Sequence, residues 1–408
     1  MRNGSKPLRG EIDLSNGAQP TTTMRRLSQL LALLAATQPL LAQSPRRIDL
    51  TAPDAALSRP FTRITAFRAL PDGRVIVADE MEGEVVLADL RSQSVSTIGR
   101  RGSGPEEYLL PRGLIPLPNG RTLLQDPGNA RFLEIDAEGR IAPQDASRSG
   151  RDQMLGLSIA WDVHGSDQSG NIFFEQLPGV LKPAHKATVP IVRWNVQRGG
   201  LDTIASYRLT EAMLSQSIES GKPGEVVVRP RAWAARPQWA VTSDGRIALA
   251  EPDPYRVVWL DAAGRRAGPP VSFRPQPVTG ADREWYLDEM NASQTRVRGA
   301  RRPSAEPRRP GAAAPTSKRA GEPIFPSSFP AFAGRESVRI DPEGAVWIAR
   351  AHSVSDTTSL YDVFDAMARR QAEARFPARS RIVGFGDGVI YVARRDEDDL
   401  EHLERYRR

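Results

Sequence analysis

The chain of 408 residues contains no cysteine. This absence excludes disulfide bonds, thiolate metal sites, thiol nucleophiles and lipid attachment through an N-terminal cysteine. Histidine is scarce, with 4 residues that are scattered and form no HExxH pair. No Gly-x-Ser-x-Gly nucleophile elbow occurs either. The sequence therefore predicts no catalytic residue, no metal ligand and no cofactor, and packing must stabilise the fold.

Long hydrophobic runs are also missing, apart from one short apolar stretch near the N-terminus. Residues 24–43 begin with Arg25 and Arg26, continue through an apolar stretch from Leu30 to Ala36 and end near a candidate cleavage site after Ala42. This pattern is typical of an export signal, and the stretch is too short to span a bilayer.

We therefore expect translation to start at Met24 and residues 1–42 to lie outside the mature protein. The mature chain is then periplasmic or extracellular, without a membrane span, and the missing cysteine means that it is not a lipoprotein. An uncleaved anchor is the alternative.

A short hairpin signature recurs along the rest of the chain, which holds many turn-forming residues, with 34 prolines and 33 glycines in total. The clearest copies, Gly73 to Asp79 and Gly120 to Asp126, begin 47 residues apart. Weaker copies begin at four further glycines, namely Gly170, Gly245, Gly344 and Gly388. A period of roughly 40 to 50 residues with four strands per repeat is typical of a β-propeller. The sequence predicts an all-β, six-bladed propeller over residues 46–408.

The last predicted blade contains only three strands before the chain stops, which would leave an open sheet edge. We expect Arg47 to Leu50 to pair there as the fourth strand. An N-terminal strand would then complete the last blade and close the ring, with the two ends of the mature chain side by side.

Between the first two blades, Gly99 to Tyr108 forms a glycine-rich segment that ends in an aromatic residue, and Pro111-Arg112-Gly113 follows. This linker resembles that of NHL-type repeats. The resemblance implies a six-bladed, NHL-like propeller of the exported bacterial kind. It also implies that loops between second and third strands share one face with the linkers into the first strands.

Two insertions break the period, at residues 207–235 and 274–334, and both fall in linkers between blades. We expect them to cover one mouth of the ring, as a partner-binding cap or as decoration. Capping and apolar patterns predict a short helix over Leu209 to Ser220 and another over Ala281 to Ala292, followed by a disordered tether.

Charged residues of both signs follow the second strands and occupy the linkers, so the same face could bind a polar ligand or peptide. The candidates are Asp79, Arg100, Arg101, Arg112, Asp126, Glu251, Arg350 and Arg394, with Glu80, Glu175, Asp253 and Arg395 beside them. The alternative interpretation is turn chemistry, because aspartates at loop starts accept backbone hydrogen bonds.

The sequence favours a non-catalytic, monomeric binding scaffold for a protein, peptide or envelope polymer over an enzyme. A metal-dependent hydrolase or lyase, like the propeller lactonases, is the alternative. A purely structural ring within a larger assembly is a third possibility. The formal charge of +7 does not predict nucleic-acid binding, because much of the excess is dispersed or lies in the Pro/Ala/Gly-rich stretch that contains Arg301 and Arg309.

Overall fold

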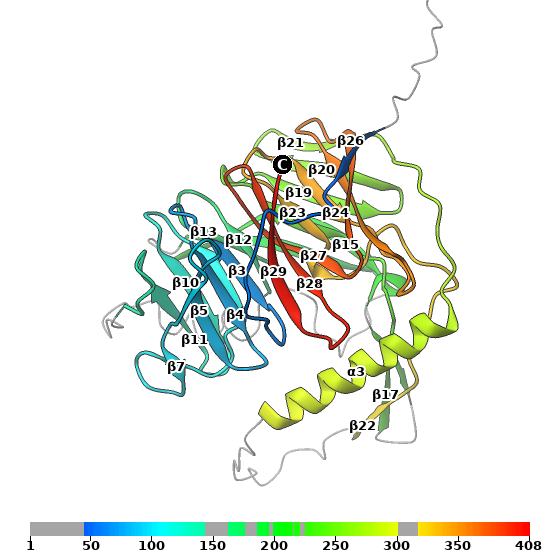
Figure 1. Cartoon of the computed structure of the whole chain (residues 1–408). Helices are drawn as coiled ribbons and strands as arrows, with labels where there is room; N and C mark the ends of the chain where they lie inside the picture. Colours follow the sequence, from blue (N-terminus) through cyan, green and yellow to red (C-terminus); the bar gives the residue numbers. More distant parts are fainter. Residues whose placement is uncertain are drawn as a thin grey trace, which may run out of the picture. The chain divides into compact units, whose positions relative to one another are not determined.

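The computed structural model describes residues 45–142, 162–175, 186–195, 199–214, 216–220, 225–300 and 317–408. Among these residues, six sheets form the blades of a β-propeller, as the sequence predicts (Figure 1). The first three blades consist of β3 (Ala66–Ala69), β4 (Val75–Asp79), β5 (Glu84–Asp89) and β6 (Ser94–Thr97); β9 (Gly113–Pro116), β10 (Thr122–Asp126) and β11 (Arg131–Ile135); and β12 (Asp162–Ser166), β13 (Asn171–Glu175), β14 (Lys186–Asn195) and β15 (Gly200–Thr210).

The last three blades follow the same order from the innermost strand outward. They consist of β18 (Gln238–Val241), β19 (Ile247–Pro252), β20 (Tyr255–Asp261) and β21 (Gly264–Ala267); β23 (Val338–Ile340), β24 (Val346–Ala349), β25 (Thr358–Phe364) and β26 (Arg370–Pro377); and β27 (Ser380–Gly386), β28 (Val389–Arg395) and β29 (Glu401–Arg407). Two N-terminal strands, β1 (Arg46–Asp49) and β2 (Ala55–Ala56), join the last two blades.

The hairpin signature forms the tight turn between the first and second strands of a blade. At Gly73 the backbone has φ +88°, a conformation in which a side chain would be strained. The preceding Asp72 accepts a hydrogen bond from the backbone N–H of Arg74 at 3.0 Å. These contacts explain why an Asp-Gly pair between two apolar runs is a strong signal for this turn.

Alternation along the strands divides the core into layers between blades. Val75 and Val77 of β4 pack toward blade 6, whereas Ile76 and Ala78 pack toward blade 2. Six apolar clusters occur among the described residues, one between each pair of neighbouring blades. Each such buried valine or isoleucine contributes about 1.5–3 kcal/mol. The ring is therefore stabilised by continuous packing around its whole circumference.

An N-terminal strand completes the last blade and closes the ring, as predicted, but a different segment forms that strand. β2 pairs antiparallel with β29 and completes blade 6, so the prediction that Arg47 to Leu50 would do so is wrong. β1, which contains Ile48, instead pairs in parallel with β26 as a fifth strand of blade 5. The reason is apolar packing, because Ile48 and Leu50 pack in the layer between blades 5 and 6 with Phe376 and Tyr406.

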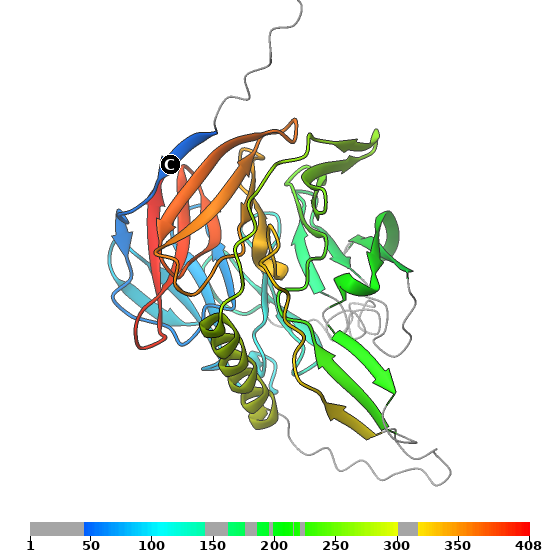
Figure 2. The same ribbon diagram turned by 90° about the vertical axis from the view of Figure 1, so that its right-hand side faces the viewer.

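The two ends of the described chain nevertheless lie side by side. β2 pairs with the C-terminal strand β29, and β1 lies along β26 of the neighbouring blade, with the C-terminus close by (Figures 1 and 2). Asp54, which precedes β2, accepts two hydrogen bonds from Arg405 at 2.9 and 3.0 Å and one from Arg407 at 2.9 Å. These charged contacts fasten the N-terminal segment to the last strand.

The glycine-rich linker is tied to blade 1 by its aromatic residue. Tyr108 is fully buried, accepts a hydrogen bond from the backbone N–H of Val85 at 2.9 Å and donates one to the carbonyl of Ile98 at 2.8 Å. The short strands β7 (Arg100–Arg101) and β8 (Glu107–Tyr108) pair in parallel beside it. The aromatic residue thus fixes the route from blade 1 to blade 2.

The two insertions join in one small sheet. β16 (Gln216–Ser220) pairs with β17 (Glu225–Pro230), which pairs in parallel with β22 (Ser317–Ala320) from the second insertion. The helix predicted over Leu209 to Ser220 is wrong. Alternate residues such as Tyr207 and Leu209 pack between blades 3 and 4, so β15 continues to Thr210 and only a 3₁₀ turn (Glu211–Met213) follows.

The helix predicted over Ala281 to Ala292 is confirmed as part of α3 (Gly280–Ala300), which lies outside the blades beside the small sheet (Figures 1 and 2). Among the described residues, no helix combines the length and apolar character that a membrane crossing requires. The predicted signal segment and much of the tether lie outside the described residues.

Candidate functional site

The loops after the second strands and the linkers into the first strands share one face, called the loop face below. Asp79, at the end of β4, accepts hydrogen bonds from the backbone N–H groups of Thr62 and Arg63 at 2.8 and 3.1 Å. Asp126, at the end of β10, does the same for Leu109 and Leu110 at 3.1 and 2.9 Å. Both aspartates are buried and hold the linker that enters their own blade, as the turn-chemistry interpretation describes.

The other six candidates are distributed around the ring rather than gathered in one place. Five of them form ion pairs, none of which joins two of the eight candidates, although Glu80 was named beside them, and Arg101 is exposed on β7. The pairs are Arg100 with Glu107 (2.6 Å), Arg112 with Glu80 (3.4 Å), Glu251 with Arg256 (2.8 Å), Arg350 with Asp362 (2.6 Å) and Arg394 with Glu404 (2.6 Å).

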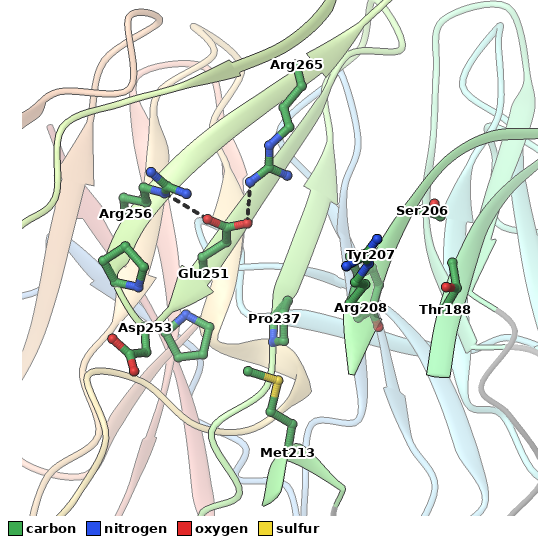
Figure 3. A pocket seen from close by; sticks show the side chains of 12 residues that line it. Thr188, Ser206, Tyr207, Arg208, Met213, Pro237, Glu251, Asp253, Arg256 and Arg265 are labelled. Carbon is green, nitrogen blue, oxygen red and sulfur yellow. Dashed lines mark hydrogen bonds and ion pairs between the residues drawn. The ribbon is translucent and has the colours of Figure 1, made fainter. Parts of the chain in front are cut away.

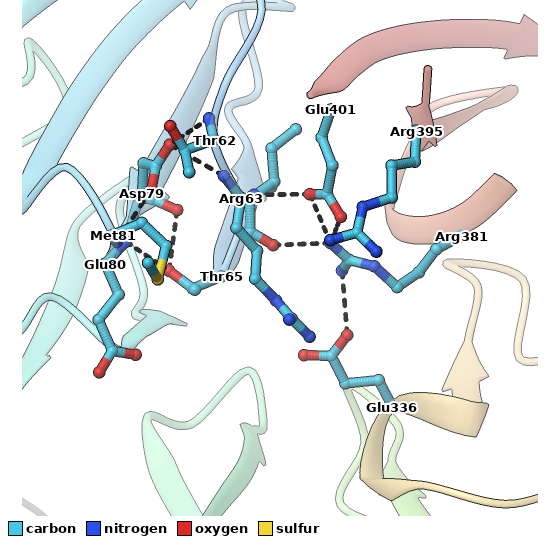
Figure 4. Close-up of polar contacts among 12 residues, drawn as sticks. Thr62, Arg63, Thr65, Asp79, Glu80, Met81, Glu336, Arg381, Arg395 and Glu401 are labelled. Carbon is cyan, nitrogen blue, oxygen red and sulfur yellow. Dashed lines mark hydrogen bonds and ion pairs between the residues drawn. The ribbon is translucent and has the colours of Figure 1, made fainter. Parts of the chain in front are cut away.

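A denser group of charges lies on the loop face where blades 5, 6 and 1 meet. It comprises Arg63, Arg335, Arg339, Arg381, Arg395, Glu289, Glu336 and Glu401, and is called the arginine cluster below. In Figure 4, Arg63, Arg381, Arg395 and Glu336 direct their side chains toward one region. Five arginines face three glutamates. Asp399 also pairs with Arg395 at 3.4 Å, but it is shared with Arg379, so two excess positive charges remain when both are counted.

Arg381, on innermost strand β27, is the central cation of this cluster. It forms ion pairs with Glu401 at 2.8 Å and with Glu336 at 3.0 Å, and donates a hydrogen bond to the carbonyl of Ile64 at 2.9 Å. Glu401 in turn accepts a hydrogen bond from the backbone N–H of Ile64 at 2.6 Å. Arg381 and Glu401 therefore fix the entry into blade 1, while Glu336 extends outward from them.

The pKa of Glu336 shows how strongly the arginines of the cluster act on a nearby carboxylate. Burial alone would raise its pKa, but the charges of Arg381 and Arg339, followed by those of Arg63 and Arg335, hold the pKa below its ordinary value. Its side chain is still 46% exposed, as is that of Arg63. Charges that converge on one carboxylate and remain open to solvent can also meet an external anion.

Arg335 extends the cluster toward the far side of the ring. It lies in a 3₁₀ turn (Arg335–Ser337) before innermost strand β23, and it donates a hydrogen bond to the carbonyl of Val163 on innermost strand β12 at 3.1 Å. The positive charge therefore reaches from blade 5 to blade 3.

Helix α3 covers part of this region through two carboxylates. Near its N-terminus, Asp282 accepts hydrogen bonds from the hydroxyl of Ser353 and the backbone N–H of Val354, both at 2.8 Å. Two helical turns later, Glu289 pairs with Arg395 at 2.7 Å and with Arg63 at 3.6 Å. The helix thus contacts blades 5 and 6 and the entry to blade 1.

A second group of polar residues is buried between blades 3 and 4. Glu175, only 1% exposed, accepts hydrogen bonds from Tyr207 (2.8 Å), Trp239 (3.0 Å) and Arg236 (3.0 Å). His164 lies 3.5 Å from Glu175 and stacks on the Trp239 ring. Burial alone would raise the pKa of Glu175, but His164 and Arg236 lower it well below its ordinary value. Because the Glu175 carboxylate on blade 3 accepts hydrogen bonds from Trp239 on blade 4 and from Arg236 just before it, it joins the two blades.

An open cleft of about 650 Å³ lies between the outer parts of blades 3 and 4 (Figure 3). Glu251 lies in it, bonded to Arg256 at 2.8 Å and Arg265 at 2.5 Å. Burial alone would raise the pKa of Glu251, but these two arginines lower it. Among the described residues, no group of three histidine or acidic side chains is placed to hold a metal ion.

Sequence reasoning missed four arginines of the cluster, Arg63, Arg335, Arg339 and Arg381. A usable signal was present, because Arg339 and Arg381 stand shortly before the hairpin signatures at Gly344 and Gly388, where the innermost strand of a blade precedes the turn. Apolar residues of such a strand pack between blades, so a charged residue there has to lie near the ring centre or at a polar seam.

No protein-family model matches the chain, and no curated protein matches it. Several solved structures are similar to it. They include the calcium-binding protein regucalcin from Agrobacterium tumefaciens (11% identity, 89% of this chain and 97% of that chain, TM-score 0.41), a gluconolactonase from Xanthomonas campestris (12%, 89% and 96%, 0.39) and a protein from Bacteroides fragilis named as exported (10%, 89% and 98%, 0.43). Similarity at this level carries no information on activity, substrate or partner.

Proposed function

We propose that this chain is an exported, non-catalytic binding scaffold that takes a protein, peptide or envelope polymer on its loop face, at the arginine cluster. The observation that carries the proposal is the excess of arginine over glutamate where blades 5, 6 and 1 meet. Arginine suits such a site, because its planar, weakly hydrated guanidinium recognises carboxylates and other anions with defined geometry.

The blades support this role by holding the arginines on rigid elements. Arg381 and Arg339 lie on innermost strands, and Arg395 lies at the end of β28. Neighbouring apolar layers fix these strands, so the arginines are organised before a partner arrives. A metal-dependent hydrolase or lyase would require several clustered ligands, and no such group occurs among the described residues.

Site-specific photocrosslinking tests the scaffold whatever the identity of the partner. A benzophenone amino acid replaces Trp285 on α3, which is 40% exposed at the loop face. The matched control replaces Met367, which is 53% exposed in the turn after β25, at the opposite end of the blades. Illumination in an envelope extract should give a discrete product from position 285 and none from position 367.

An Arg63→Glu substitution sharpens this test, because it reverses the charge of a half-exposed member of the cluster. We expect the product from position 285 to decrease at least about tenfold. Equal products from both positions, or a product that Arg63→Glu leaves unchanged, would contradict binding through the arginine cluster.

A further inference from the structure

Helix α3 contacts the blades through polar groups, and a partly exposed aromatic side chain adds contacts with the linker and the second insertion. The ring of Tyr286 lies 5.3 Å from that of Trp233 and 5.6 Å from that of Phe325. Among residues 280–291, only Asp282 is buried, whereas Tyr286, Leu287 and Met290 are partly exposed and Trp285 is exposed. Burial of apolar surface is the main force that docks one element on another. No apolar residue of this stretch is buried, so the contacts of α3 with blades 5, 6 and 1 depend on Asp282 and Glu289.

The helix itself has an independent source of stability. Thr279 and Asp282 form a reciprocal capping box, in which Asp282 accepts from the backbone and hydroxyl of Thr279 at 2.8 and 2.6 Å and its own N–H donates to that hydroxyl at 3.3 Å. A backbone contact of Val278 with Ser327 at 3.1 Å anchors the segment just before the helix. α3 can therefore leave the arginine cluster as a folded helix that pivots near Thr279.

Glu289 is the one glutamate of the arginine cluster that α3 supplies. Its two carboxylate oxygens face different arginines, one on Arg395 at 2.7 Å and the other on Arg63 at 3.6 Å. Glu336 and Glu401 belong to the ring itself. If α3 moves away, the cluster keeps both ring glutamates and has three excess positive charges.

We infer that Glu289 occupies the place of a partner's carboxylate, so that α3 is a displaceable cap and the natural occupant of the arginine cluster is an acidic peptide segment. The inference rests on the proposed function and names the chemistry of its partner. A protein carboxylate is the group that these arginines already accept in the capped state. A peptide rich in glutamate or aspartate can supply that group and compete with α3 for it.

Fluorescence anisotropy with a labelled oligoglutamate peptide tests the competition. Glu289→Gln removes the competing charge and should bind the peptide about three- to tenfold more tightly than the unchanged protein. Glu284→Gln is the matched control, because Glu284 is exposed on the same helix, and it should bind as the unchanged protein does. Arg395→Gln should weaken binding.

A direct readout of displacement uses the absence of native cysteine. Spin labels at Asp288→Cys on α3 and at Glu397→Cys in the loop after β28 report the separation of helix and ring, because both residues are exposed. Oligoglutamate should shift the measured distance distribution to longer values. A distribution unchanged at saturating peptide would overturn the displaceable cap even if every variant folds.

The outcomes separate this inference from the scaffold proposal. Equal peptide affinity of Glu289→Gln and Glu284→Gln overturns the competition by Glu289. Equally tight binding of inorganic polyphosphate, with the same dependence on Arg395, overturns the assignment of an acidic peptide. In either case the photocrosslink from position 285 still decides the scaffold proposal, and loss of that crosslink overturns the scaffold itself.

Discussion

Strand β4 and helix α3 represent two ways of holding an element in place. All five residues of β4 are buried, and its side chains fill the layers on both sides of blade 1. In the part of α3 up to residue 291, only Asp282 is buried, and charged contacts join the helix to the blades, with Tyr286 adding partly exposed aromatic contacts. Apolar layers are insensitive to charge screening, whereas exposed ion pairs are weakened by salt. The ring is therefore a fixed scaffold, and α3 is a cover whose docking depends on charge.

The largest expected effect comes from a cavity within a blade layer. Phe364 is fully buried between blades 4 and 5, with its ring 5.9 Å from that of Tyr255. Phe364→Ala should lower the free energy of unfolding by about 3–5 kcal/mol in urea denaturation.

The matched change on the helix is Trp285→Ala, which should alter the free energy of unfolding by no more than about 0.5 kcal/mol. Equal effects of the two substitutions would abolish the distinction between ring and cover.

An intermediate effect is expected where charge, rather than an apolar layer, fastens the ring. Asp54 receives hydrogen bonds from Arg405 and Arg407 and joins the N-terminal segment to β29. Asp54→Asn should lower the free energy of unfolding by about 1–2 kcal/mol, since charge-assisted hydrogen bonds of a partly buried group are lost. Asp72→Asn is the control, because Asp72 is 50% exposed and its ion pair joins it to Arg74, two residues away in the same turn.

The contribution of Asp54 should also depend on pH. The hydrogen bond from Arg405 lowers its pKa below the ordinary value of 3.8, against the opposing effect of burial. A lowered pKa means that the stabilisation is present in full above pH 3.8 and is lost as pH falls through the folded-state pKa. The difference in stability between Asp54→Asn and the unchanged protein should therefore shrink below pH 3.8. A difference that grows in acid would contradict the role of this ion pair.

The sequence predicted those features that each blade encodes locally. The Asp-Gly turn at Gly73, the alternation of β4 and the linker that contains Tyr108 lie within short segments, and the hairpin signature repeats after 47 residues. The β2 strand is only two residues long, so no pattern distinguished it from Arg47 to Leu50. Leu209 to Ser220 showed helix signals, but packing between blades 3 and 4 favoured extended chain.

Local patterns could single out Arg339 and Arg381 but not the arginine cluster as a whole, because its members lie far apart in the sequence. Arg63, Glu289, Arg381 and Glu401 meet only when ring closure places blade 6 against blade 1. The eight predicted candidates stood at loop starts and linkers, where turn geometry alone accounts for Asp79 and Asp126. Charged residues on innermost strands are the better guide in such a fold.

Native-state hydrogen exchange compares the two regions directly, and it detects local opening, whose free energy is smaller than the unfolding effects above. The amides of α3 should exchange by local opening, with an opening free energy well below that of the β4 amides. Oligoglutamate should increase the exchange rates of the α3 amides and leave those of the β4 amides unchanged. Protection of α3 equal to that of β4, with or without the peptide, would contradict a rigid ring carrying a displaceable cover.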